Sequence, residues 1–226
     1  MASVSSSVLT LNRSQTTAIK EHLESVTDDL LASLLPAAHL SAEQRRGIIA
    51  RYTAVLEGNF IYWMTGAYLS VATEEARSII LDNLHEEVRD SHPLMLRKFA
   101  MAAHAVPNDS DALAVYRNLS NVRLFIGRLS TVPIVVMMAF FEGFIQRFMA
   151  YLAELAQRQG SVEQEYTDVH GVCDVAHTQG LLCALEAEMA LVHESREPAR
   201  DLFEGVELLE ELIRNITNPE YLMARH

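Results

Sequence analysis

The chain has 226 residues, half of them hydrophobic, and a formal net charge of −12. This length suffices for one large or two small domains with a sizeable core. With only nine Gly and six Pro, an all-β fold with many turns is disfavoured. The negative charge disfavours nucleic acid and anionic membranes as partners, because both bind basic surfaces.

Cysteine content and the N-terminus indicate a cytoplasmic protein. Cys173 and Cys183 are too few and too close in sequence for a disulfide framework, so we interpret them as reduced thiols. The N-terminus lacks the basic and apolar segments of a signal peptide. The longest uncharged run, residues 58–73, is shorter than the roughly 20 apolar residues that span a bilayer. We therefore predict no membrane segment.

Helical periodicity dominates the first half of the chain. Residues 1–12 are Ser-rich and predicted to be disordered. A first helix is predicted from near Ser14 to Pro36, and a second from Ser41 to about Val71. The second opens with Ser-Ala-Glu-Gln, a capping box in which the Ser and Gln side chains satisfy first-turn amides.

The remaining helices are predicted as follows. A third helix starts at Thr73, falters over residues 89–91 and resumes at a proline that suits a first turn. Further helical regions are expected over 110–118, 121–159 (with Pro133 as a start or kink), 162–193 and 199–216. No strand is predicted, so we expect one all-α domain of about seven helices covering residues 1–226.

His170, Asp174 and His177 form a triplet with spacing i, i+4 and i+7. At roughly 100° per residue, the three side chains lie within about 60° of one another on a helix face. Two imidazoles and a carboxylate on one face are ligands for iron, manganese or zinc. Such a triplet also arises by chance, so a metal site requires further ligands elsewhere in the chain.

Glu142 interrupts an apolar run, Pro-Ile-Val-Val-Met-Met-Ala-Phe-Phe-Glu-Gly-Phe-Ile. Its helical neighbours are apolar, so we expect the carboxylate to be buried. A buried carboxylate is costly unless it is paired, protonated or bound to metal. Two interpretations stay open on the residues alone: a metal ligand, or a salt bridge to an interior arginine such as Arg128.

The segment 83–93, Asn-Leu-His-Glu-Glu-Val-Arg-Asp-Ser-His-Pro, offers two glutamates and two histidines. On an unbroken helix Glu87 and His92 would lie about 140° apart, so they can share one metal only if the chain unwinds between them. The rival pair is His85 with His92, seven residues apart on one continuous face. Glu86 is interpreted as a solvated residue at a helix end.

Together, these motifs resemble those of the haem-oxygenase-like di-iron oxidases. The resemblance rests on Asn-Leu-x-x-Glu followed closely by His, a Glu in a buried helix, and His-x-x-x-Asp-x-x-His, over residues 74–190. It implies a seven-helix haem-oxygenase-like bundle and selects Glu87, four residues after Asn83, over Glu86. The implied metal ligands are Glu87, His92, Glu142, His170, Asp174 and His177.

The resemblance also implies the chemistry. Two iron ions are the expected cofactor, O₂ the co-substrate, and an external reductant or the substrate the source of electrons. We favour desaturation of a small aliphatic amino acid in specialised-metabolite biosynthesis, leading to C–C cleavage or closure of a strained ring such as an azetidine. The alternatives are oxidative decarboxylation of a fatty acid and N-oxygenation of an amine.

A substrate needs an apolar wall and an anchor near the metals. Arg128 projects to the Glu142 face, and its guanidinium suits a carboxylate because it binds both oxygens. A salt bridge or a surface charge is the plainer role for this arginine. The expected wall comprises Val135, Met138, Phe140 and Phe141.

Two other functional classes stay open. One is a metal-free relative on the same scaffold, such as a thiaminase-like hydrolase, for which Cys173 would be the thiol. The other is a non-catalytic helical binding protein. The sequence leaves open the electron donor and the oligomeric state, a homodimer included.

Overall fold

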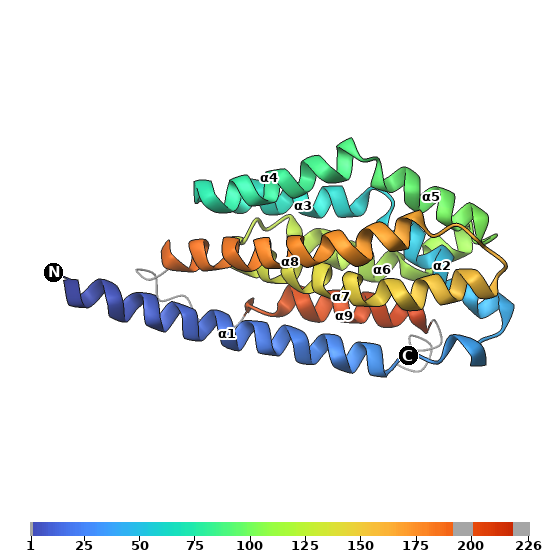
Figure 1. Ribbon diagram of the computed structural model, residues 1–226, viewed down its shortest axis with the longest axis horizontal. Helices are drawn as coiled ribbons and strands as arrows, with labels where there is room; N and C mark the ends of the chain where they lie inside the picture. The colour runs from blue at the N-terminus through green and yellow to red at the C-terminus, as the bar shows by residue number, and fades with distance from the viewer. Residues whose placement is uncertain (1, 192–200, 219–226) are drawn as a thin grey trace.

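The computed structural model describes residues 2–191 and 201–218, with side chains from residue 15 onward, and this part of the chain is an all-α bundle (Figure 1). Its elements are α1 Ala2–Ala32, the 3₁₀ turn η1 Ala37–His39, α2 Ala42–Leu56, α3 Asn59–Ser70, α4 Glu74–Arg89, α5 His92–Ala102, α6 Asp109–Ile126, α7 Thr131–Arg158, α8 Glu165–Leu191 and α9 Glu204–Thr217. The predicted all-α class is confirmed.

The predicted count of seven helices is too low for the described residues. The helix predicted over 41–71 is two helices, because Glu57 is extended and Gly58 adopts the left-handed conformation at φ 84°. Apolar residues flank this break, so periodicity alone hides it. α1 begins at Ala2, before the predicted start near Ser14. Pro133 lies in the first turn of α7, where its missing N–H has no intrahelical acceptor to lose.

Local capping explains several helix starts. Ser41 Oγ accepts from Gln44 N at 3.1 Å and Gln44 Oε1 accepts from Ser41 N at 2.8 Å, which confirms the predicted capping box. Thr73 Oγ1 accepts from Ala76 N at 3.2 Å at the start of α4. These bonds satisfy amides that lack a partner in the first turn of a helix.

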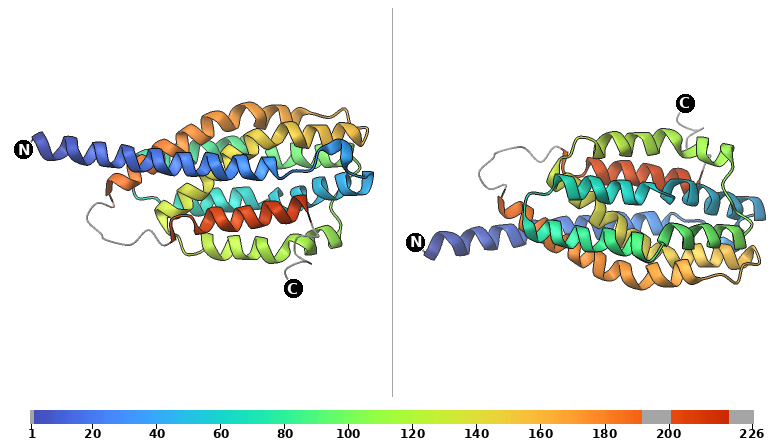
Figure 2. Two further views of the ribbon diagram at one scale, coloured as in Figure 1. Left: turned by 90° about the horizontal axis from the view of Figure 1, so that it is seen from below. Right: turned by 90° about the horizontal axis from the view of Figure 1, so that it is seen from above.

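α7 is the central helix of the bundle (Figures 1 and 2). It packs along α8 and also contacts α1, α2, α3 and α9. By length and composition it is the one described helix apolar enough to cross a membrane, but 72% of its most apolar window is buried inside the bundle. Burial by neighbouring helices is typical of a core helix. α7 carries Glu142 into this apolar interior.

α4 and α8, which bear most of the predicted ligands, are joined near one end by Glu188. This buried carboxylate of α8 accepts from Thr73 N at 2.7 Å, Thr73 Oγ1 at 2.6 Å and Ala72 N at 3.1 Å. It therefore caps the start of α4 from a neighbouring helix. This contact ties the C-terminal part of α8 to the start of α4.

Candidate metal centre

The first half of the site is built at the break between α4 and α5. α4 ends at Arg89, Ser91 adopts the left-handed conformation at φ 58°, and α5 begins with His92. This turn brings His92 Nδ1 to 2.7 Å from Glu87 Oε1, with both side chains buried. The predicted unwinding is therefore present. His85, the rival partner, is exposed on α4.

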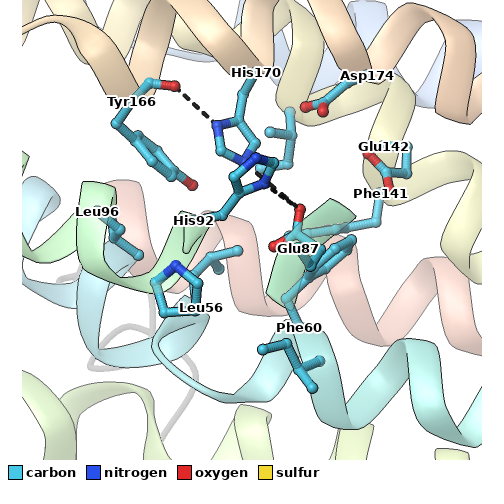
Figure 3. A pocket seen from close by; sticks show the side chains of 13 residues that line it. Leu56, Phe60, Glu87, His92, Leu96, Phe141, Glu142, Tyr166, His170 and Asp174 are labelled. Carbon is cyan, nitrogen blue, oxygen red and sulfur yellow. Dashed lines mark hydrogen bonds and ion pairs between the residues drawn. The ribbon is translucent and has the colours of Figure 1, made fainter. Parts of the chain in front are cut away.

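His170 of α8 completes this half (Figure 3). Its Nε2 lies 3.8 Å from Glu87 Oε1, and its ring centroid lies 4.6 Å from that of His92. His170 Nδ1 lies 2.9 Å from the carbonyl oxygen of Tyr166. A carbonyl only accepts, so Nδ1 donates this bond and Nε2 is left to face Glu87. The ligand atoms of Glu87, His92 and His170 lie within 4.8 Å of one another.

The second half gathers Glu142, Asp174 and His177. His177 Nδ1 lies 3.8 Å from Glu142 Oε1 and 3.7 Å from Asp174 Oδ1. Asn83, which lies on α4 one turn before Glu87, donates from Nδ2 to Glu142 Oε1 at 3.0 Å. Asp174 Oδ2 and His177 Nδ1 are buried and have no hydrogen-bond partner among the described residues. Both atoms are therefore available to a cation.

The electrostatics of this half favour a bound cation. Burial, reinforced by the charge of Asp174, raises the pKa of Glu142 to about 7. Burial also works against a charged His177, but its contacts with Asp174, Glu142 and Glu86 prevail and raise its pKa to about 11. Acidic side chains thus crowd one buried imidazole. A metal ion would relieve their repulsion in place of the imidazole proton.

In the first half of the site, contacts with histidines outweigh the effect of burial on the pKa of the carboxylate. Burial alone would raise the pKa of Glu87, but the contacts with His170 and His92 prevail and lower it. The same contact raises the pKa of His170 against the effect of burial. Glu87 is therefore an ionised carboxylate with two imidazoles beside it, a combination that suits iron.

The spacing of the ligand atoms also fits metal ions. Two ligands each about 2.1 Å from one metal are separated by about 3 Å at a right angle and about 3.6 Å at 120°. The separations of 3.7 and 3.8 Å around His177, and of 3.8 Å between His170 and Glu87, are close to this range. With three carboxylates and three imidazoles, the residues fit two iron ions with mixed oxygen and nitrogen ligands.

A small cavity of about 30 Å³ lies against the ligands. Its apolar lining comes from α2, α3, α5 and α7 and includes Leu56, Phe60, Leu96, Phe141 and Ile145. A cavity needs about 10–15 Å³ to hold one water molecule. The space therefore admits a molecule of a few atoms, and a larger substrate requires these side chains to move.

The structure corrects most of the predicted substrate contacts. Arg128 has a side chain that is 53% exposed and pairs with Glu204 at 2.6 Å, so it is a surface ion pair and not an anchor in the cavity. Val135 and Met138 are buried in the core but do not line the cavity. Phe141 alone of the expected wall is in the lining.

Sequence reasoning missed several residues around the site. Tyr166 precedes His170 by one turn, holds its ring through the backbone carbonyl and places its own hydroxyl 2.8 Å from that of Tyr52. Extending the triplet back by one helical turn would have found Tyr166. Leu56 and Phe60 flank the unpredicted break between α2 and α3, so the predicted continuous helix gave no indication that they line a cavity beside the ligands.

Cys173 lies beside the second half of the site. Its Sγ donates to Asp174 Oδ1 at 3.2 Å, and its sulfur lies within 4.8 Å of the ligand atoms of Asp174 and His177. Burial, followed by the charge of Asp174, raises the pKa of this thiol. A protonated thiol is a poor nucleophile. Cys173 also does not line the cavity.

The fold and the site together define a helical enzyme of the iron-dependent redox class. Residues 49–212 match the family model described as "Iron-containing redox enzyme", a haem-oxygenase-like family. This match covers most of the 226 residues, so the chain belongs to that family. No curated protein and no solved structure matches the chain. The resemblance to a haem-oxygenase-like family is thereby confirmed.

Proposed function

We propose that this iron-containing redox enzyme is an O₂-dependent non-haem di-iron oxidase acting on a small aliphatic molecule. The observation that carries the proposal is the convergence of six buried or half-buried ligands from α4, α5, α7 and α8. One iron would be held by Glu87, His92 and His170, and the other by Glu142, Asp174 and His177. When bound, the iron pair supplies reduction of O₂ and the oxidising power for the substrate.

The chain's own residues hold and shield this centre. The Tyr166 carbonyl fixes the His170 tautomer at 2.9 Å, and Asn83 donates to Glu142 at 3.0 Å, so one ligand in each half is oriented by a hydrogen bond. Phe60, Phe141 and Ile145 line the cavity beside the ligand atoms, where their apolar side chains would keep bulk water out. Exclusion of water strengthens the electrostatic contacts and limits side reactions.

The cavity lining bears on the substrate. We propose that the target is an unactivated C–H bond of an aliphatic amino acid, with desaturation as the first outcome. Within the described part of the chain no Lys or Arg side chain lines the cavity. This favours a substrate whose reacting portion is hydrocarbon, and it supports a fatty acid as the second candidate. We further propose a cytoplasmic location and an external electron donor.

Metal and oxygen measurements on the same preparations test this function. Metal-free protein is titrated with Fe(II) under anaerobic conditions, and O₂ uptake is then followed with panels of aliphatic amino acids and fatty acids. We expect close to two irons per chain and uptake that one panel accelerates. A wild-type chain that binds no iron would refute the proposal.

Three variants sharpen the test. His177→Ala and Glu142→Ala should each abolish O₂ uptake while circular dichroism shows retained helicity, because each removes a ligand from one half of the site. His85→Ala is the matched control, since this exposed histidine lies on α4 outside the proposed ligand set. Normal turnover by either ligand variant would eliminate the metal assignment.

A further inference from the structure

The two histidines that α8 contributes are held by different kinds of acceptor. His170 Nδ1 donates to the buried Tyr166 carbonyl at 2.9 Å, within its own helix. His177 instead places Nε2 at 2.9 Å from Glu86 Oε2 on α4. His177 Nδ1 then faces Glu142 and Asp174 and has no hydrogen-bond partner among the described residues.

Glu86 and Glu87 are adjacent in the last turn of α4, yet they contact histidines in different halves of the site. Glu87 is 6% exposed at its side chain and contacts His92 and His170. Glu86 is 43% exposed and contacts His177 from the outer side of the ring. The sequence favoured a solvated helix end for Glu86 and left open whether it takes part in the site. The structure instead gives it a hydrogen bond to a side chain that is 9% exposed.

We propose that Glu86 is a positioning residue that fixes His177 for the second metal; this inference rests on the proposed function. With Nε2–H donating to Glu86, the Nδ1 lone pair points at the space between Glu142 and Asp174. A carboxylate in this role sets both the tautomer and the orientation of an imidazole ligand, and raises its basicity. Glu86 itself stays on the far side of the ring and is not a ligand.

This arrangement makes the two metal sites unequal. The first half does not depend on Glu86, because the Tyr166 carbonyl and the α4–α5 turn fix its imidazoles. The second half depends on a partly exposed side chain of the neighbouring helix. Removing Glu86 should therefore weaken one of the two metals and spare the other.

The experiment compares metal binding by the full-length wild type, Glu86→Ala, Glu86→Gln and Asp82→Ala. Asp82 is an exposed carboxylate one turn earlier on α4 and is the matched control. Anaerobic Fe(II) titration should give two irons for wild type and Asp82→Ala. Glu86→Ala should keep the first iron and bind the second about 10–100-fold more weakly. Glu86→Gln should recover most of this loss, because its amide oxygen still accepts from Nε2–H.

A second readout reports the His177 tautomer directly. In the Zn(II)-loaded protein, ¹⁵N NMR of the imidazoles should show Nε2–H and a metal-bound Nδ1 for His177, and Glu86→Ala should lose the hydrogen-bonded Nε2–H signal. Two irons bound by Glu86→Ala with wild-type affinity would overturn the inference. So would a Glu86→Gln variant as impaired as Glu86→Ala, since that result would make Glu86 a ligand.

Failure of the proposed function gives a different result. A wild-type chain that binds no iron overturns both proposals. A wild type that binds two irons alongside an unaffected Glu86→Ala overturns only the role of Glu86.

Discussion

Replacing Glu142 by glutamine should stabilise the metal-free protein at neutral and alkaline pH while impairing the metal site. Burial, with the charge of Asp174, raises the pKa of Glu142 from 4.5 to about 7. The folded state therefore binds more protons than the unfolded chain between these values, so this carboxyl lowers stability progressively as pH rises from 4.5 to 7. Glutamine keeps the shape and can still accept from Asn83.

The pKa difference sets the size of the effect. At about 1.4 kcal/mol for each pH unit between the two pKa values, ionised Glu142 costs the metal-free fold about 3 kcal/mol at pH 8. Glu142→Gln should therefore raise the free energy of unfolding by up to about 3 kcal/mol at pH 8 and change it little near pH 4.5. Urea unfolding followed by circular dichroism, in EDTA, measures both values.

Bound metal should reverse the order of stability of the wild type and Glu142→Gln. Under anaerobic Fe(II) the wild type should gain more stability than Glu142→Gln, because metal bound only to the folded state stabilises it. Glu186→Gln, an exposed glutamate on α8, is the control and should change little in any condition. A Glu142→Gln variant less stable than wild type at pH 8 without metal, or equally shifted at every pH, would refute the reasoning.

Three further outcomes follow from packing and capping. Glu188→Ala should cost about 2 kcal/mol in urea unfolding, because the α4 cap loses a charged acceptor; an unchanged midpoint would contradict this role. Gly66→Ala should lower the free energy of unfolding by about 1–3 kcal/mol, since its Cβ would lie 2.3 Å from Ile126 Cγ2. In Gly143→Ala the added Cβ meets nothing nearer than 3.6 Å, so this variant should gain up to about 1 kcal/mol. Thermal unfolding should therefore show changes in stability of opposite sign for the two variants. Phe60→Ala should cost about 3 kcal/mol and shift O₂ uptake toward bulkier substrates, because it enlarges the cavity; an unchanged substrate profile would argue against Phe60 as part of the substrate wall.

Much of the site was accessible to prediction because ligand geometry follows helix periodicity. The spacing of His170, Asp174 and His177 placed them on one face, and the isolated charge of Glu142 in an apolar run predicted its burial, which the structure gives as 2% exposed. The faltering pattern before Pro93 likewise predicted the break that the structure contains. In each case a short-range rule sufficed.

Contacts between helices were not accessible in the same way. The hydrogen bond that His177 donates to Glu86 joins residues 91 apart, and nothing local to Glu86 distinguishes it from a solvated helix end. The assignment of Arg128 to the cavity failed for a related reason. That prediction assumed one continuous helix through residues 127–130, but α6 ends before this segment and α7 begins after it. Helical periodicity therefore does not relate the direction of Arg128 to that of Glu142.

The left-handed turn at Ser91 has a consequence for how the chain can vary. It lies on the surface, where loops ordinarily tolerate insertions and deletions. Here, adding or removing one residue would rotate the start of α5 by about 100° and swing His92 away from Glu87. The turn at Ser91 therefore couples the length of this corner to the position of His92, so a change in length here requires a different turn if Glu87 and His92 are to stay in contact.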